Sequence, residues 1–221
     1  MCKCRQALDI FPFLKWPYSI VMFWPTVLFA RAWSWGFPQQ RRVWDRIPGT
    51  PIVVGAVPLW SYEFSQLKDM GVAAVVNLCI EWEPDIQQLE SHALLSLHVP
   101  VVDMTPPTQA QLMQCVRWIT EALTQARGEG KPDALVYVHC KAGRGRSVLV
   151  AAACLMVWGG LSPSDAAGAI LAVRPHASDK SKHPALLQLH ATLTAPISGS
   201  AVDAHGLREA GATLLGGSAS T

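Results

Sequence analysis

A stretch of nine residues, His139 to Ser147, contains the residue types that phosphoryl transfer through a cysteine requires. Cys140 follows an apolar run at residues 134–138, two glycines follow within the loop, and an alanine-rich run continues from Ser147 to Trp158. This pattern predicts a strand, a tight loop and a helix. Backbone N–H groups in such a loop point inward, and the first turn of the helix adds unpaired donors and a positive dipole. The stretch is therefore a candidate phosphate-binding loop.

The thiol of Cys140 and two side chains after it would supply the chemistry. A cysteine in this electropositive position has its pKa lowered from about 8.5 into the range of roughly 3.5 to 7.5, which makes it a thiolate nucleophile at neutral pH. Arg146 can fold back and bind two phosphate oxygens through its planar guanidinium group, and Ser147 can donate to the sulfur as it leaves a phosphocysteine. An ordinary buried cysteine in a plain glycine turn is the competing interpretation, but the combined spacing argues against it.

The remaining loop residues are the expected substrate-binding groups, through their backbone N–H groups and two cations: Lys141, Ala142, Gly143, Arg144 and Gly145. For each of the two cations taken alone, simple exposure to solvent is an equally good interpretation.

Cleavage also needs a carboxylic acid, because phosphoryl transfer to a thiolate leaves an alkoxide or phenoxide; such an acid contributes about 10² to 10⁴ in rate. Asp103 is the predicted acid, since it ends an apolar run at residues 95–102 and begins a proline-stiffened loop that could close over the substrate. The same group would then activate the water that hydrolyses the phosphocysteine. An ordinary turn aspartate is the alternative. Glu81 and Glu83 follow the preceding apolar run, and they are either substrate-binding groups at the same rim or surface carboxylates without a function.

The elements that must position these groups alternate between strand and helix. β-Branched apolar runs predict strands at residues 52–55, 72–78, 95–102 and 134–138. Helical spacing and capping residues predict helices at residues 61–70, 85–91, 108–123, 147–158, 162–173 and 184–193. This order predicts an α/β fold with a central, mainly parallel sheet flanked by helices and the phosphate loop at the carboxyl end of a strand.

The composition restricts the possible partners and cofactors. Residues 1–50 hold seven Lys or Arg and two Asp or Glu, so this part carries a net charge of +5 while the chain as a whole carries +2. Five of the nine tryptophans also lie there, a combination that favours a membrane surface. No motif supports nucleic-acid binding. The six cysteines are scattered and form no metal set, so we expect no metal and no cofactor, in a reducing compartment. The sequence does not indicate an oligomeric state.

The residues before the domain form an apolar arm. Residues 16–30 carry no charge, but fifteen residues are short for a spanning helix, and three prolines interrupt residues 12–25. A membrane-associated or targeting segment over residues 1–43 is the first interpretation, with contacts to the membrane surface through residues 16–46; an arm packed on the domain is the second. The phosphatase-like domain is predicted at residues 44–195, and residues 196–221, rich in Gly, Ser and Ala, are predicted to be disordered.

The motifs together resemble the mitochondrial protein-tyrosine-phosphatase-like family, in the dual-specificity branch of the cysteine-dependent phosphatases. The resemblance covers roughly residues 20–193. It is carried by the phosphate loop and by four shorter motifs: Asp103-Met-Thr, Glu81-Trp-Glu83, Trp44-Asp-Arg-Ile47 and Val54-Gly-Ala-Val-Pro58. It implies Cys140 as nucleophile, Arg146 as phosphate-binding arginine and Asp103 as acid. The cationic stretch that the family has after its penultimate helix differs here, with Arg174 kept and Lys180 and Lys182 further on.

The resemblance also implies a substrate. Members of that family dephosphorylate phosphatidylglycerophosphate in cardiolipin biosynthesis, which leads us to expect an anionic phospholipid substrate and the mitochondrial inner membrane, with another intracellular membrane or the cytoplasm as alternatives. A soluble dual-specificity protein phosphatase would explain the loop and the acid but not the apolar arm. A phosphoinositide phosphatase is favoured by Lys141 and Arg144. A phosphate-binding pseudophosphatase would fit a chain that lacks the nucleophile or the acid.

Overall fold

The fold is known from a computed structural model that describes residues 15–37, 42–195 and 201–216. Its centre is a five-stranded sheet with the strand order β1-β2-β5-β3-β4. The strands are β1 (Trp44–Arg46), β2 (Ile52–Ala56), β3 (Val72–Cys79), β4 (Leu95–Val101) and β5 (Leu135–Cys140). All neighbouring strands are parallel except the edge pair β1 and β2. The predicted mainly parallel sheet is therefore confirmed.

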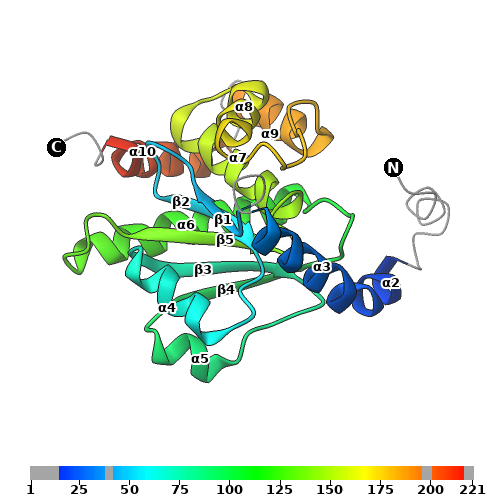
Figure 1. Cartoon of the computed structure of the whole chain (residues 1–221). Coiled ribbons are helices and arrows are strands. Elements are labelled where there is room, and N and C mark those ends of the chain that lie inside the picture. Colours follow the sequence, from blue (N-terminus) through cyan, green and yellow to red (C-terminus); the bar gives the residue numbers. More distant parts are fainter. Residues whose placement is uncertain (1–14, 38–41, 196–200, 217–221) are drawn as a thin grey trace.

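Helices cover both faces of the sheet (Figure 1). One face carries α4 (Ser61–Asp69) and α5 (Ile86–Ser91); the other carries α6 (Gln109–Gly128), α7 (Arg146–Gly159), α8 (Pro163–Val173), α9 (Pro184–Thr194) and α10 (Ala201–Gly216). The helix α7 is buried from Arg146 to Trp158, which explains its nearly continuous apolar sequence. The two-sided cover is why β3 and β5 lack the alternation of polar and apolar residues.

The capping residues begin the helices where the sequence places them, with one shift. Thr108 accepts a hydrogen bond from Gln111 N at 3.2 Å, and Ser162 accepts from Asp165 N at 3.2 Å, as expected of N-cap side chains. Ser61 is not the cap of α4, because Trp60 holds that position. The carboxylate of Glu63 instead accepts from the backbone N–H of Trp60 at 3.2 Å.

The register of the sheet brings the strand ends that matter here to one edge. Cys140 pairs with Ala56 at the end of β2, and His139 pairs with Asn77 near the end of β3. The carboxyl ends of β2, β3, β4 and β5 therefore meet at the same edge, where the loops of a parallel sheet form its binding site. This is the edge to which the sequence assigns the phosphate loop.

The apolar arm forms two helices, α2 (Lys15–Val21) and α3 (Phe23–Gly36). One stripe of α3 is buried, with Phe23 and Val27 packed against Val57 and Arg31 only 3% exposed. The guanidinium of Arg31 pairs with the buried Glu63 of α4 (Nη1 to Oε1, 2.9 Å). The helix α3 therefore packs on the domain along one side.

None of the helices in the described part of the chain has the length and apolar character that a membrane span requires.

One sequence-based expectation needs correction. Residues 201–216 form the helix α10, although the tail was expected to be disordered. Leu214 is 2% exposed, and the Arg127 side chain donates to the carbonyl oxygens of Thr213 at 2.9 Å and Leu214 at 2.8 Å. The sequence did not predict this helix, because Gly and Ala are abundant in the tail and only a few leucines form its buried side. The rest of the tail, residues 196–200 and 217–221, lies outside the described residues.

Residues 44–46 belong both to the stretch predicted to contact a membrane surface, residues 16–46, and to the predicted domain, residues 44–195. They form β1 and pair with β2, and the side chain of Asp45 is buried inside the domain. A three-residue edge strand has too little pattern to be recognised in a sequence. The domain boundary at residue 44 nevertheless coincides with the start of the sheet.

Candidate active site

The thiol of Cys140 lies at the carboxyl end of β5, immediately before the loop that leads into α7. The residue is 4% exposed, and its Sγ lies 3.4 Å from Ser147 Oγ. Burial acts to raise the pKa of the thiol, but the charge of Arg146 and hydrogen bonds from the Ser147 hydroxyl and backbone outweigh it and hold the pKa below its ordinary value. The site therefore favours the thiolate that nucleophilic attack requires.

Arg146 is the first residue of α7 and lies beneath the loop, 4% exposed. Its guanidinium donates to two backbone oxygens at the ends of neighbouring strands, Leu78 O at 3.1 Å and Val101 O at 2.6 Å. Glu81 binds both terminal nitrogens of the same group in a two-point ion pair, with Nη1 to Oε2 at 3.1 Å and Nη2 to Oε1 at 2.8 Å. This fork-to-fork contact fixes the plane of the guanidinium.

Asp103 is oriented by the turn that ends β4. Thr105 N donates to Val102 O at 3.1 Å, and Met104 between them has a left-handed backbone (φ 62°), which is uncommon for a residue other than glycine. The Asp103 carboxylate meets two cations, Arg146 Nη2 at 3.1 Å and Lys141 Nζ. Burial acts to raise its pKa, but these cations outweigh burial and hold the pKa below the ordinary value. Asp103 is thus ionised in this structure.

These groups line one cavity of about 420 Å³, within the range of small-molecule sites. Three segments form it: the loop after β4, the phosphate loop with the start of α7, and the segment between α8 and α9. Of the predicted site residues, the lining contains Asp103, Cys140, Lys141, Ala142, Arg144, Gly145 and Arg146. The structure therefore brings Cys140, Arg146 and Asp103 together around one space.

The two glutamates predicted at the rim have different positions. The side chain of Glu81 is fully buried behind Arg146, so it contacts the phosphate-binding residue and not the cavity. Glu83 is 63% exposed and pairs with His98 of β4 (3.3 Å), so the structure does not bring it into the cluster. Their spacing of two residues after a strand predicted the same rim for both. The turn after β3 separates them.

Gly143 completes the loop but does not face the cavity. Its backbone is left-handed (φ 64°), and a side chain there would collide with the backbone of Gly55 and with the Arg174 guanidinium. Arg174 Nε donates to Gly143 O at 2.7 Å, and Nη1 pairs with Asp45 Oδ2 at 2.6 Å. Arg174 is 1% exposed, so this cation, which the chain shares with the family's cationic stretch, supports the phosphate loop from behind.

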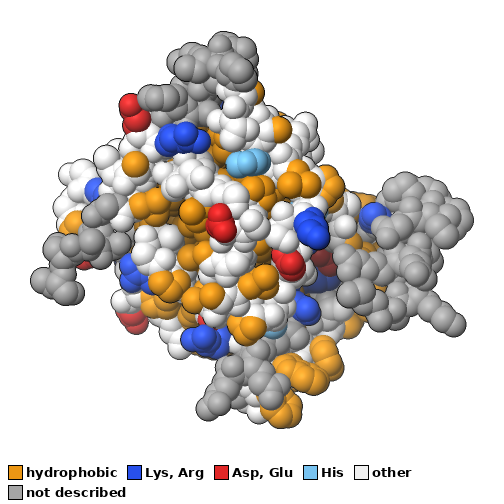
Figure 2. Space-filling model, turned by 90° about the horizontal axis from the view of Figure 1, so that it is seen from above, with side chains coloured by type: hydrophobic (Ala, Val, Ile, Leu, Met, Phe, Trp, Pro, Cys, Tyr) orange, Lys and Arg blue, Asp and Glu red, His pale blue; other side chains and the backbone are white. Residues whose placement is uncertain are grey.

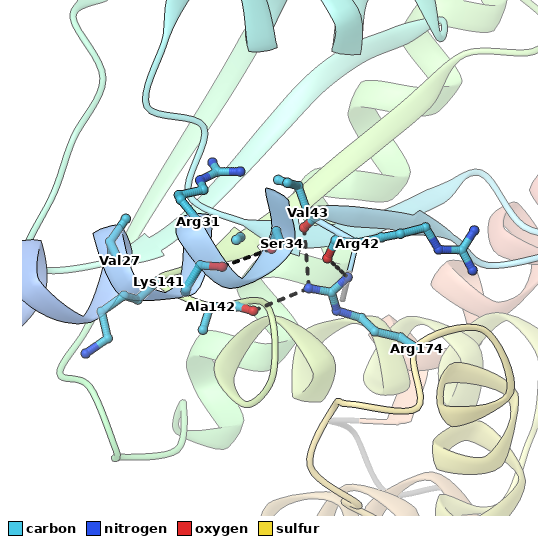
Figure 3. Close-up of a pocket in the computed structure, with 10 residues that line it drawn as sticks. Val27, Arg31, Ser34, Arg42, Val43, Lys141, Ala142 and Arg174 are labelled. Atoms are coloured by element: carbon cyan, nitrogen blue, oxygen red, sulfur yellow. Dashed lines mark hydrogen bonds between the residues drawn. The ribbon is translucent and has the colours of Figure 1, made fainter. Parts of the chain in front are cut away.

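Figure 3 shows this support from the side of the arm. The Arg174 guanidinium points to the backbone oxygens of Ala142 and Val43, and α3 lies over the same part of the loop. Val27 and Arg31 of α3 and Lys141 line a small hollow together. No local sequence pattern predicts this contact, because α3 and Lys141 are far apart in the chain. The arm and the phosphate loop are thus direct neighbours.

Two further groups near the nucleophile are neutral. Burial raises the pKa of the Cys79 thiol well above its ordinary value and lowers the pKa of His139 to about 3. The His139 ring stacks on Tyr137 with a centroid separation of 5.5 Å, which suits a structural role in β5. Among the described residues, no group of three or more His, Cys, Asp or Glu side chains could hold a metal ion.

Comparisons of the sequence with known proteins agree with this arrangement. The family described as "Polymorphic toxin system, DSP-PTPase phosphatase" matches residues 56–160. The phosphatidylglycerophosphatase and protein-tyrosine phosphatase 1 of Mus musculus is 33% identical over 184 residues, which are 79% of this chain and 91% of the mouse protein.

Solved structures show the same relationship. The crystal structure of PTPMT1 superposes with a TM-score of 0.55 and 32% identity, covering 66% of this chain and 93% of that one. A crystal structure of PTPMT1 in complex with PI(5)P has a TM-score of 0.55 and 25% identity, covering 76% of this chain and 97% of that one. The fold around the cavity is therefore that of a cysteine-dependent phosphatase.

Proposed function

The chain belongs to the family of the phosphatidylglycerophosphatase and protein-tyrosine phosphatase 1, and we propose that it converts phosphatidylglycerophosphate to phosphatidylglycerol through a phosphocysteine. The observation that carries this proposal is the meeting of a low-pKa thiol, a fixed arginine and a carboxylate in one cavity beside an apolar arm. Family membership makes the chain a phosphatase. The lipid substrate is our inference from the relatives and from the arm.

In the first step, the Cys140 thiolate attacks the phosphorus of the monoester while Arg146 and the loop N–H groups bind the non-bridging oxygens. A sulfur–phosphorus bond forms and the bond to the leaving oxygen breaks. Protonated Asp103 gives its proton to that oxygen, which leaves as the alcohol of the glycerol headgroup.

In the second step, the Asp103 carboxylate accepts a proton from a water molecule that attacks the phosphocysteine. The sulfur–phosphorus bond breaks, inorganic phosphate is released, and the thiolate is restored. The hydroxyl of Ser147, 3.4 Å from Sγ, stabilises the departing sulfur. No cofactor is needed, because thiol and carboxyl carry every transfer.

Substrate binding itself prepares Asp103 as the acid. Its carboxylate contacts Arg146 and Lys141, the two cations that a phosphate dianion would also bind. When a phosphate binds these two cations, they no longer lower the pKa of Asp103, and the negative charge of the phosphate raises this pKa further. The carboxyl group then gains a proton.

We further propose that the exposed side of the arm rests on the membrane that holds the substrate. The stripe of α3 with Phe23, Val27 and Arg31 is buried on the domain, while the other sides of α2 and α3 expose large apolar residues. These are Trp16, Ile20, Val21, Trp24, Leu28, Phe29, Trp33 and Trp35. Hydrophobic side chains gather at the lower margin of Figure 2, on the side of the molecule where α3 lies. A helix pair of this kind suits the membrane interface, with tryptophans at the headgroup level.

This attachment is tested by sedimentation of the full chain with vesicles that contain phosphatidylglycerol. We expect Trp24→Ser combined with Phe29→Ser to lower the bound fraction about tenfold or more, because two large apolar groups leave the lipid. A matched control carries Ile86→Ser and Leu187→Ser, exposed apolar residues on α5 and α9, and should bind as the wild type does. Equal losses in both variants would exclude the arm as the docking surface.

The substrate is tested by phosphate release from three substrates in lipid micelles: phosphatidylglycerophosphate, a phosphoinositide and a phosphotyrosine peptide. Cys140→Ser is the blank, because it removes the nucleophile. We expect the highest kcat/KM with phosphatidylglycerophosphate. Preference for the phosphoinositide would support the alternative of a phosphoinositide phosphatase, which agrees with the crystal structure of PTPMT1 in complex with PI(5)P. Preference for the peptide would indicate a dual-specificity protein phosphatase.

We also propose that the protein is located at the mitochondrial inner membrane, because the family resemblance implies this location. Fractionation of cells that express the full chain, with markers for both mitochondrial membranes and the cytosol, tests it. Recovery with the cytosol or with another membrane would replace it by one of the other locations.

A further inference from the structure

The segment between α8 and α9 forms one wall of the active-site cavity. Three of its residues line the cavity together with the phosphate loop: Ser178, Lys180 and His183. The lining from Cys140 to Arg146 is sufficient to hold one phosphate, since it contains the nucleophile, the loop and the arginine fork. A cavity of about 420 Å³ therefore has room and polar groups beyond those that the reacting phosphate uses.

This wall is held against the phosphate loop by one backbone hydrogen bond and two hydrogen bonds from arginine side chains. Ser178 N donates to Arg144 O at 2.9 Å, and Arg144 Nε donates back to His176 O at 2.6 Å. Arg174, at the start of the segment, donates to Gly143 O at 2.7 Å. The wall therefore keeps a constant position relative to a phosphate bound in the loop, as a second binding site on the same ligand requires.

The side chains of the wall suit an anion. Lys180 is half-buried, and its charge, together with burial as the larger cause, lowers the pKa of His183. His183 Nδ1 accepts a hydrogen bond from Ala185 N at 3.2 Å, so the proton of the neutral ring lies on Nε2, which is then a donor. The nearby Asp179 carboxylate accepts a hydrogen bond from Ser181 N at 2.8 Å, and the charges of Lys182 and Lys180 also act on it. The wall thus offers a cation and an N–H donor.

We propose that Lys180 and His183 bind a second anionic group of the substrate, a phosphodiester joined through a glycerol unit to the phosphate that reacts at Cys140. The inference rests on the proposed function and deepens it, since phosphatidylglycerophosphate carries both groups on one glycerol. It assigns selectivity for a lipid headgroup to the wall and the chemistry to the loop. Lys182, which is exposed and does not line the cavity, has no part in it.

The test uses the full chain and two soluble substrates, so that membrane binding does not enter. One is short-chain phosphatidylglycerophosphate below its micelle concentration, and the other is p-nitrophenyl phosphate, which has a single phosphate. For Lys180→Gln we expect KM for the lipid to rise about tenfold to 100-fold, as for a lost charge-assisted hydrogen bond. The loss of kcat/KM on the lipid should exceed the loss on p-nitrophenyl phosphate by at least about tenfold. Lys182→Gln, the matched control, removes the same charge two residues away and should not change this ratio.

A second variant separates binding from folding. His183→Asn keeps an oxygen that can cap α9, because asparagine is a preferred N-cap residue, but removes the Nε2 donor. We expect it to change the ratio in the same direction as Lys180→Gln.

Wild-type turnover of the short-chain lipid tests the proposed function by itself. If the wild type turns over the lipid but Lys180→Gln leaves its KM unchanged, the inference is wrong and the proposed function stands. Equal losses on both substrates would also overturn it, because Lys180 would then act on the reacting phosphate. If the wild type hydrolyses only p-nitrophenyl phosphate, the proposed function itself fails. A further assay measures Lys180→Gln on a short-chain phosphoinositide. A loss of activity on both lipids would mean that the wall binds the phosphodiester of either lipid. A loss on phosphatidylglycerophosphate alone would mean that binding requires the glycerol spacing.

Discussion

The carboxylate of Asp103 lies 3.1 Å from the guanidinium of Arg146, so the proposed acid is bound to the group that we propose binds the substrate phosphate. Lys141 contacts the other carboxylate oxygen. Without substrate, Asp103 therefore occupies these cations as a carboxylate, and an arriving phosphate has to displace it. The exchange couples phosphate binding to protonation of the acid, because the cations that depress the Asp103 pKa are the same ones that phosphate engages.

Replacing the acid tests this coupling. We expect Asp103→Asn to lower kcat about 10² to 10⁴-fold for an alkyl phosphate and much less for p-nitrophenyl phosphate, whose leaving group needs little protonation. The descending limb of the pH profile of kcat on the alkyl phosphate should also disappear, because no acid remains to lose its proton. Equal slowing of both substrates would contradict the role of Asp103.

The same pair makes a prediction for stability. The folded-state pKa of Asp103 lies below its unfolded value, which is about 3.9 for a free side chain. Its ionised form thus stabilises the fold at pH values above the unfolded pKa, and this contribution is lost as the pH falls through the folded pKa. In urea unfolding without phosphate, we expect the stability advantage of wild type over Asp103→Asn to be present at pH 7 and to shrink on acidification. A pH-independent difference would rule out the ion pair as its source.

Removal of the hydroxyl beside the nucleophile should shift its titration. The Ser147 hydroxyl helps hold the Cys140 pKa down, so in Ser147→Ala the pKa rises and less thiolate is present at a given pH. The midpoint of iodoacetamide alkylation should move to higher pH, and kcat should fall about tenfold because the departing sulfur loses a donor. An unchanged midpoint would show that the Ser147 hydroxyl does not control the thiol, which would leave Arg146 and the backbone N–H of residue 147 as the causes of its low pKa.

The two glutamates after β3 form a matched pair of variants. Glu81→Gln replaces the charged partner of Arg146, and we expect kcat/KM for p-nitrophenyl phosphate to fall about 10- to 100-fold, as for a lost charge-assisted hydrogen bond. Glu83→Gln changes an exposed pair with His98, and its loss should stay within about threefold. Similar losses would mean that Glu83 also serves the site.

The support behind the phosphate loop should appear in stability measurements. Asp45→Asn leaves the fully buried Arg174 without its counter-charge, which costs about 3–5 kcal/mol in comparable pairs. Arg42→Gln removes only the exposed partner of the same carboxylate and should cost about 1 kcal/mol or less. Urea unfolding of both variants compares the two contacts. A small effect of Asp45→Asn would mean that the backbone contacts of Arg174 suffice.

The sequence by itself determined the parts of this protein that local pattern encodes. The phosphate loop is contiguous from Cys140 to Ser147, so its chemistry can be recognised without any other part of the chain. The strands of a sheet covered on both faces are apolar runs, and N-cap residues such as Thr108 and Ser162 mark where helices begin. The parallel order of these elements then placed Asp103 at the same edge as Cys140.

Only the tertiary structure decided which residues behind that edge serve the site. Glu81 and Glu83 are equivalent in a sequence, and the turn after β3 buries one against Arg146 and exposes the other. Arg174 and Lys180 are both cations after α8, yet one is buried behind the phosphate loop and the other lines the cavity. The burial of a charge depends on contacts between residues far apart in the chain, such as Asp45 with Arg174, and no local pattern records those contacts.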